Sequence, residues 1–92
     1  MIKHIYLLQL KERMMADEVM EKLLTLKEKI PYMLDMEVGM DFKGDKNSAD
    51  IIEVCCFKNR EDFLAFGADP YHAEVRNYIN GVASGIKIDY EV

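Results

Sequence analysis

The two histidines are the residues of this chain whose type best suits proton transfer near neutral pH. His72 follows Pro70 and Tyr71 in the stretch DPYHAEV, and His4 stands close to the N-terminus. An imidazole held by a carboxylate such as Asp89 keeps one tautomer and can act as a general acid or base. The alternative is that backbone or water satisfies His72 at the start of a helix and that His4 only fills a sheet. Both interpretations are open on the sequence alone.

Metal and thiol chemistry have weaker support. A metal needs three or four converging ligands, and the two histidines, Asp89 and Glu53 match no ligand motif in their spacing. The only cysteines, Cys55 and Cys56, are adjacent and would point to opposite faces of a strand, which disfavours a disulfide between them. We therefore expect no metal, no cofactor and two free thiols.

Length and charge restrict the class of protein. The 92 residues make one domain, and at this size folding buries only roughly 60 to 65% of the unfolded chain's surface. The net charge of −5 and the scattered basic residues argue against nucleic acid as a partner. No apolar run approaches the roughly 20 residues that span a bilayer, and no signal-peptide pattern opens the chain. We expect a cytoplasmic protein with no membrane partner.

Hydrophobic periodicity predicts the elements that must position the histidines. Alternating or densely apolar stretches predict strands at residues 2–10, 36–42, 49–57 and 86–92. A helical period predicts helices from residue 14 or 15 to about 29, from 60 to 66, and from 70 to about 80. Asn59 and Asp69 are the expected N-caps of the second and third helices, and Gly67 is expected to end the second.

The order βαββαβ is that of a ferredoxin-like α+β fold, with an antiparallel sheet and helices on one face. Toward the helices we place His4, Tyr6, Leu8, Leu10, Ile52, Val54 and Cys56. Away from them we place Ile5, Leu7, Ile51, Glu53, Cys55 and Phe57. The second face is too apolar to stay exposed, so we expect a homodimer that stacks sheet on sheet.

Four stretches resemble the stress-responsive α/β-barrel (Dabb) family, and the likeness covers nearly the whole chain. They are MIKHIYLLQLK, IPYMLDMEVG, FKNREDFLAFGADPYHAEV and IDYEV. The most specific parts are the K-H near the N-terminus, the P-x-H at 70–72 and the closing D-Y. The resemblance implies a dimeric α/β barrel with a pocket between sheet and helices in each subunit.

The family includes plant stress proteins and a polyketide cyclase, similar to olivetolic acid cyclase, that works without metal or cofactor. The resemblance implies that the cyclase's histidine base corresponds to His72, its N-terminal histidine to His4 and its aspartate to Asp89. The cyclase's assisting tyrosine corresponds to Phe66, which has no hydroxyl. Such a hydrogen-bond donor is worth roughly 3 to 4 kcal/mol in acyl chemistry, so its absence argues against the cyclase reaction itself.

We thus expect a single domain over residues 1–92 that binds a small hydrophobic or carbonyl-containing molecule. The alternative is a cofactor-free enzyme, cyclase-like or monooxygenase-like, with His72 as general base. The expected catalytic residues are His72, His4 and Asp89. The expected ligand-binding residues are Tyr6, Leu8, Val54, Phe66 and Val75.

Overall fold

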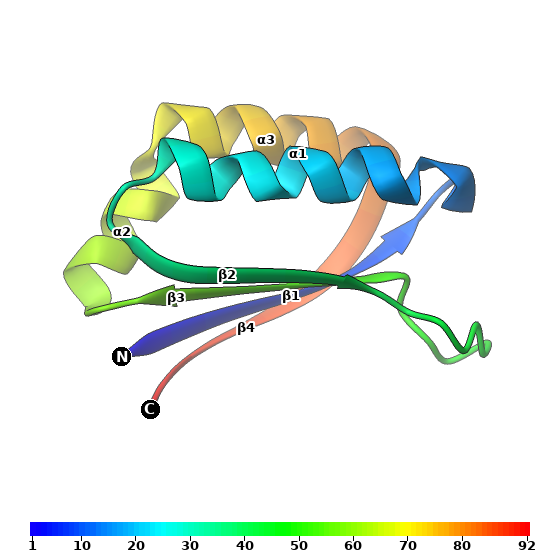
Figure 1. Ribbon diagram of the computed structural model, residues 1–92, viewed down its shortest axis with the longest axis horizontal. Coiled ribbons are helices and arrows are strands. Elements are labelled where there is room, and N and C mark those ends of the chain that lie inside the picture. Colours follow the sequence, from blue (N-terminus) through cyan, green and yellow to red (C-terminus); the bar gives the residue numbers. More distant parts are fainter.

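The computed structural model describes all 92 residues and confirms the ferredoxin-like α+β fold. The strands are β1 (Ile2–Leu10), β2 (Met33–Met40), β3 (Ile51–Phe57) and β4 (Ala83–Glu91). The helices are η1 (Arg13–Met15, a 3-10 turn), α1 (Ala16–Lys29), α2 (Arg60–Ala68) and α3 (Pro70–Val82). The strands form one antiparallel sheet in the order β2-β3-β1-β4. Figure 1 shows α1 and α3 side by side over one face, with α2 at one end.

The predicted caps explain where α2 and α3 begin. Asn59 Oδ1 accepts a hydrogen bond from the backbone N–H of Asp62 at 2.9 Å. Asp69 Oδ1 accepts from two backbone N–H groups of the first turn of α3, and Pro70 occupies a position where a missing N–H costs nothing. The second helix runs one residue beyond Gly67, where we expected it to end.

The central strand β1 gathers the polar residues of the site because it pairs with both β3 and β4. His4 lies opposite Asp89 on β4, and Tyr6 lies opposite Glu53 on β3 and Lys87 on β4. Residues directly opposite one another in an antiparallel pair point to the same face. Five polar side chains from three strands therefore share the helix-facing side of the sheet.

The predicted facing of β3 is wrong. Ile51, Glu53, Cys55 and Phe57 are buried beneath the helices, whereas Ile52, Val54 and Cys56 lie on the other face. Every residue of β3 except Glu53 is apolar, so no alternation marks the inner side, and we had assigned the carboxylate to the outside. The second strand also differs, since β2 begins at Met33 and contains a register shift before Asp35.

Apolar residues from the helices and the sheet form the core. Phe57 of β3 lies 4.9 Å from Phe66 of α2 between ring centroids, and both side chains are buried. The first helix adds Val19, Leu23 and Leu26 at helical spacing. This packing fixes the helices on one face only.

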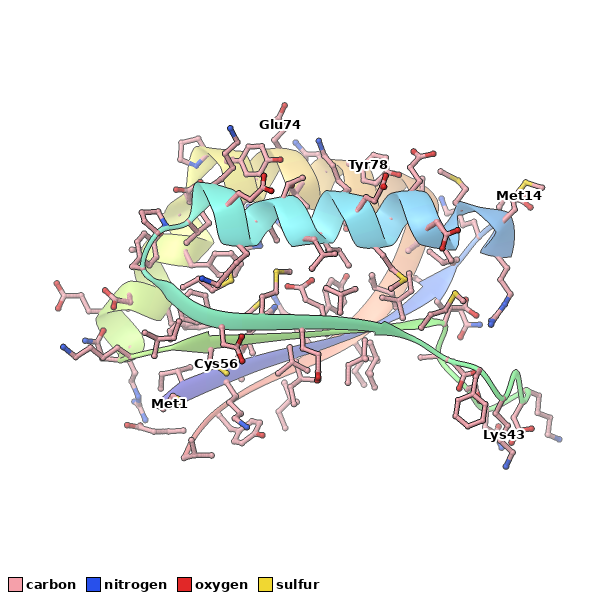
Figure 2. All side chains as sticks on the ribbon, viewed as in Figure 1. Met1, Met14, Lys43, Cys56, Glu74 and Tyr78 are labelled. Atoms are coloured by element: carbon pink, nitrogen blue, oxygen red, sulfur yellow. The ribbon has the colours of Figure 1, made fainter.

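The opposite face of the sheet is open (Figure 2). Ile86 and Ile88 on β4 are 70% and 60% exposed, and Leu7 and Ile52 on the neighbouring strands are also exposed. Contiguous apolar surface of this kind is characteristic of an interface. No helix of the chain combines the length and apolar character needed to cross a membrane.

Candidate functional site

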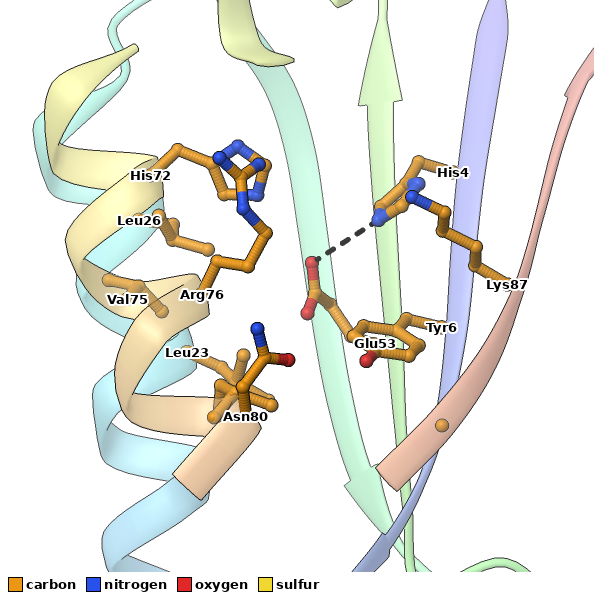
Figure 3. Close-up of a pocket in the computed structure, with 12 residues that line it drawn as sticks. His4, Tyr6, Leu23, Leu26, Glu53, His72, Val75, Arg76, Asn80 and Lys87 are labelled. Atoms are coloured by element: carbon orange, nitrogen blue, oxygen red, sulfur yellow. Dashed lines mark ion pairs between the residues drawn. The ribbon is translucent and has the colours of Figure 1, made fainter. Parts of the chain in front are cut away.

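A cavity of about 230 Å³ lies between the sheet and the helix pair. It has a sheet wall, formed by β1, β3 and β4, and a helix wall, formed by α1 and α3 (Figure 3). The sheet wall consists of His4, Tyr6, Glu53, Gly85 and Lys87. The helix wall consists of Leu23, Leu26, His72, Val75, Arg76, Ile79 and Asn80.

His4, on the sheet wall, lies between the carboxyl groups of Asp89 and Glu53. Its Nδ1 forms a hydrogen bond with Asp89 Oδ1, and its Nε2 lies 3.9 Å from Glu53 Oε1. The ring is only 7% exposed, because Phe63 and Phe66 pack against it at centroid distances of 6.0 and 6.1 Å. The carboxylate of Asp89 accepts from Nδ1–H and so fixes the orientation of the imidazole.

His72 is held in a different way on the helix wall. Its Nδ1 lies 3.0 Å from the backbone oxygen of Phe66. A carbonyl oxygen can only accept, so Nδ1 carries the proton and Nε2 of the neutral ring keeps its lone pair. Burial lowers the pKa of His72, and the charges of Arg76 and His4 lower it further, against the opposing effects of the Phe66 hydrogen bond and Asp69. The structure thus presents a neutral imidazole with a free acceptor nitrogen.

Phe66 connects the two imidazoles without lining the cavity. Its ring stacks on His72 at a centroid distance of 3.8 Å and an interplanar angle of 18°. The same ring meets His4 edge-on. An aromatic ring without a hydroxyl therefore separates the two histidines.

Glu53 is the site residue that sequence reasoning placed on the wrong face. Its side chain is on the sheet wall, only 3% of the residue is exposed, and the Cys55 thiol donates a hydrogen bond to Oε1 at 3.2 Å. Burial raises the pKa of Glu53, while the Cys55 hydrogen bond and the charge of His4 lower it. Burial, and after it the neighbouring Glu53 carboxyl group, raise the pKa of the Cys55 thiol. A lone carboxylate in an apolar strand was the signal that could have identified this residue.

The other predicted residues lie in four different places. Tyr6 and Val75 line the cavity. Leu8 is fully buried in the core rather than in the cavity wall. Val54 lies on the open face, so its predicted inward position is wrong for the reason given for β3. Asp89 stands behind His4 and contacts it, but is not part of the cavity wall.

Three polar residues of the cavity were missed. Arg76 and Asn80 lie one and two turns beyond His72 on α3, and Lys87 faces them from β4. Neither Arg76 nor Lys87 has a carboxylate within 4.0 Å. Arg76 is four residues after His72, a helical spacing that could have indicated a place on the same side of the helix. A basic residue in a helix is, however, usually part of its exposed surface. No three His, Cys, Asp or Glu side chains converge as metal ligands.

The fold and the cavity define a ferredoxin-like α+β protein with an internal site between sheet and helices. Residues 2–92 match the model of the family described as Stress responsive A/B Barrel Domain (Dabb), and the chain belongs to this family. A search of curated protein sequences found no significant match.

Several solved structures share the fold over nearly the whole chain. A dimeric ferredoxin-like protein from Bacteroides fragilis is 22% identical, with a TM-score of 0.83 and coverage of 99% of this chain and 95% of that one. Another from Thermobifida fusca is 19% identical, with a TM-score of 0.85 and coverage of 99% and 90%. A hydroxynitrile lyase from Passiflora edulis is 18% identical, with a TM-score of 0.86 and coverage of 99% and 92%. At these identities the likeness shows the fold alone.

Proposed function

We propose that this protein binds a small, largely apolar molecule that carries an oxygen function such as a carbonyl. The observation that supports this most directly is the two-sided cavity. Leucine, valine and isoleucine side chains on the helix wall face polar groups on the sheet wall. Its volume of about 230 Å³ lies below the roughly 300 to 1,000 Å³ of typical ligand pockets, so the ligand is small.

Titration with acetophenone, a small aromatic ketone, tests the proposal. We expect amide chemical shifts to change around the cavity in NMR spectra of the wild-type protein. Val75→Phe fills the cavity and should abolish these changes, with its folding checked by the same spectra. Leu24→Phe is the matched control, because Leu24 is exposed on α1 and does not line the cavity. Equal binding by Val75→Phe, or no binding by the wild type, would count against the proposal.

Cofactor-free proton transfer is a second candidate, favoured by the free Nε2 of His72. Tyr6 lines the same cavity and supplies a hydroxyl, which Phe66 cannot. That a hydroxynitrile lyase has this fold supports the candidate by showing that the scaffold can carry catalysis. The assay is exchange of the ketone's α-protons in deuterated water. We expect His72→Ala to slow any catalysed exchange by about 100-fold or more.

We also propose that two copies of the chain pair through their open sheet faces. The exposed apolar side chains of β1, β3 and β4 support this, as does the dimeric description of the Bacteroides fragilis and Thermobifida fusca proteins. Ile88→Lys places a charge on the open face and should shift the mass measured by light scattering from dimer to monomer. Leu24→Lys, on the helix side, should not. A monomeric wild type at micromolar concentration would refute the pairing.

A further inference from the structure

Glu53 has one oxygen committed to the protein and one left for the cavity. Oε1 accepts from the Cys55 thiol and faces His4 Nε2. Oε2 has no hydrogen-bond partner in the protein. Every fully buried side-chain oxygen does have one, so Oε2 is not fully buried. Oε2 is therefore reached from the cavity, although only 3% of the residue is exposed. Figure 3 shows the carboxyl group between the strands and the helix wall.

We propose that Glu53 is a ligand-binding residue whose neutral carboxylic acid donates a hydrogen bond from Oε2 to an acceptor oxygen of the ligand. This deepens the proposed function and rests on it, because it assigns the ligand to the class of ketones and related carbonyl compounds. Since the thiol of Cys55 occupies Oε1, the acid proton belongs on Oε2, the oxygen that faces the cavity. Burial favours the neutral acid, because a charged carboxyl loses its hydration there.

The surrounding charges argue against the main alternative, in which an ionised Glu53 binds an amine. Arg76 on α3 and Lys87 on β4 both line the cavity and would repel a cationic ligand. Neither forms an ion pair with Glu53, whose only basic neighbour within 4.0 Å is His4, and that contact is made through Oε1 and leaves Oε2 unpaired.

The groups that face Glu53 determine how its proton responds to pH. They are His4 and Tyr6 from β1, Cys55 from its own strand, Lys87 from β4, and His72 and Arg76 from α3, while α1 contributes only leucines. Burial lowers the pKa of His72, which also faces the cavity, so a pH effect must be assigned by comparison with a variant at position 53. Glu53→Gln keeps a donor of the same shape at every pH.

The experiment compares three probes of similar size: acetophenone, ethylbenzene and 1-phenylethylamine. Dissociation constants are measured by NMR titration from about pH 5 to pH 9 for the wild type, Glu53→Gln and Glu53→Val. We expect the wild type to bind the ketone about 3- to 10-fold more tightly than the hydrocarbon at low pH, the effect of one net hydrogen bond. This preference should vanish as Glu53 ionises with rising pH. Glu53→Gln should keep it throughout, and Glu53→Val should lack it throughout.

A second readout needs no ligand. The difference between infrared spectra of the wild type and Glu53→Gln should show the C=O stretch of a protonated carboxyl at neutral pH. An ionised Glu53 in that spectrum, a ketone preference that survives in Glu53→Val, or tighter binding of the amine would each overturn the inference while leaving cavity binding intact. If no probe binds any variant, the proposed function fails, and the inference that rests on it fails too.

Discussion

Gly85 offers a test of the cavity geometry through one added carbon atom. A Cβ at this position would lie 2.3 Å from Tyr6 Cε1 and 2.9 Å from Tyr6 Cζ. It would also lie 2.6 Å from the backbone oxygen of Leu7. These separations are far shorter than van der Waals contact, so Tyr6 can lie across β4 only because position 85 has no side chain.

The expected cost of Gly85→Ala follows from two opposing effects. Overpacking a filled site costs about 1 to 3 kcal/mol, whereas replacing a strand glycine by alanine recovers about 0.5 to 1 kcal/mol of backbone entropy. One collision is with backbone, which cannot move aside as a side chain can, so the cost falls at the upper end. We expect a net loss of about 2 kcal/mol and a melting temperature lower by roughly 8 to 16 °C.

Thermal and urea unfolding, followed by circular dichroism at one fixed protein concentration, measure this loss. Gly81→Ala is the matched control: beyond its chain neighbours and its own helix backbone, no atom lies within 4 Å of the added carbon. Alanine also suits α3 better than glycine does, so the stability of this variant should rise slightly. Tyr6→Leu combined with Gly85→Ala should lose less than the sum of the two single changes, because the colliding ring is gone. A Gly85→Ala variant as stable as the wild type would refute the described position of Tyr6.

Three further predictions concern titration and buried polar contacts. The pKa of His72 is lower in the folded than in the unfolded protein, so the unfolded chain binds more protons. Stability should therefore fall as pH drops below about 6.5, by at most about 1.4 kcal/mol per pH unit, and urea unfolding of His72→Gln should lack this component. The pKa of Glu53 is raised, so its neutral form stabilises the fold at low pH, and this contribution is lost as pH rises through the folded-state pKa. In the same measurement, the free energy of unfolding of Glu53→Gln should therefore increase relative to that of the wild type toward alkaline pH. Asp50 is buried and accepts from the Leu10 backbone N–H at 2.7 Å, so Asp50→Ala should cost about 1 to 3 kcal/mol by calorimetry, whereas the exposed Asp45→Ala should cost under about 0.5 kcal/mol.

The sequence predicted the fold because most local signals agreed with one another. Asn59, Asp69 and Pro70 mark helix starts by side-chain chemistry that needs no tertiary context. The pairing of His4 with Asp89 was accessible for a related reason, since the βαββαβ order makes the first and last strands neighbours. Helix caps and the order of the elements were thus reliable guides.

Which side of β3 faces the helices could not be predicted, because both of its faces are apolar. One face meets the helices, and the other belongs to the open side of the sheet. Period-2 alternation is informative only where one face meets water, so it could not distinguish the two faces of β3, and the alternation that we assumed placed Glu53 on the outer face. Arg76 and Lys87 were also not predicted to line the cavity. Whether they do depends on the distance between α3 and β4, which is a tertiary property.

The positions of Phe66 and Glu53 together explain how the site can be polar without the tyrosine that the family resemblance would place at position 66. Phe66 stacks on His72 and is buried outside the cavity wall, whereas Tyr6 and Glu53 line that wall. In the proposed site the acceptor nitrogen of His72 lies on the helix wall, and the donors, Tyr6 and the acid of Glu53, lie on the sheet wall. A carbonyl compound between the walls would have its oxygen bound on one side and its adjacent C–H bonds toward a base on the other. Binding and proton abstraction would then use the same ligand orientation, so a loss of ketone preference in Glu53→Val should be accompanied by slower α-proton exchange.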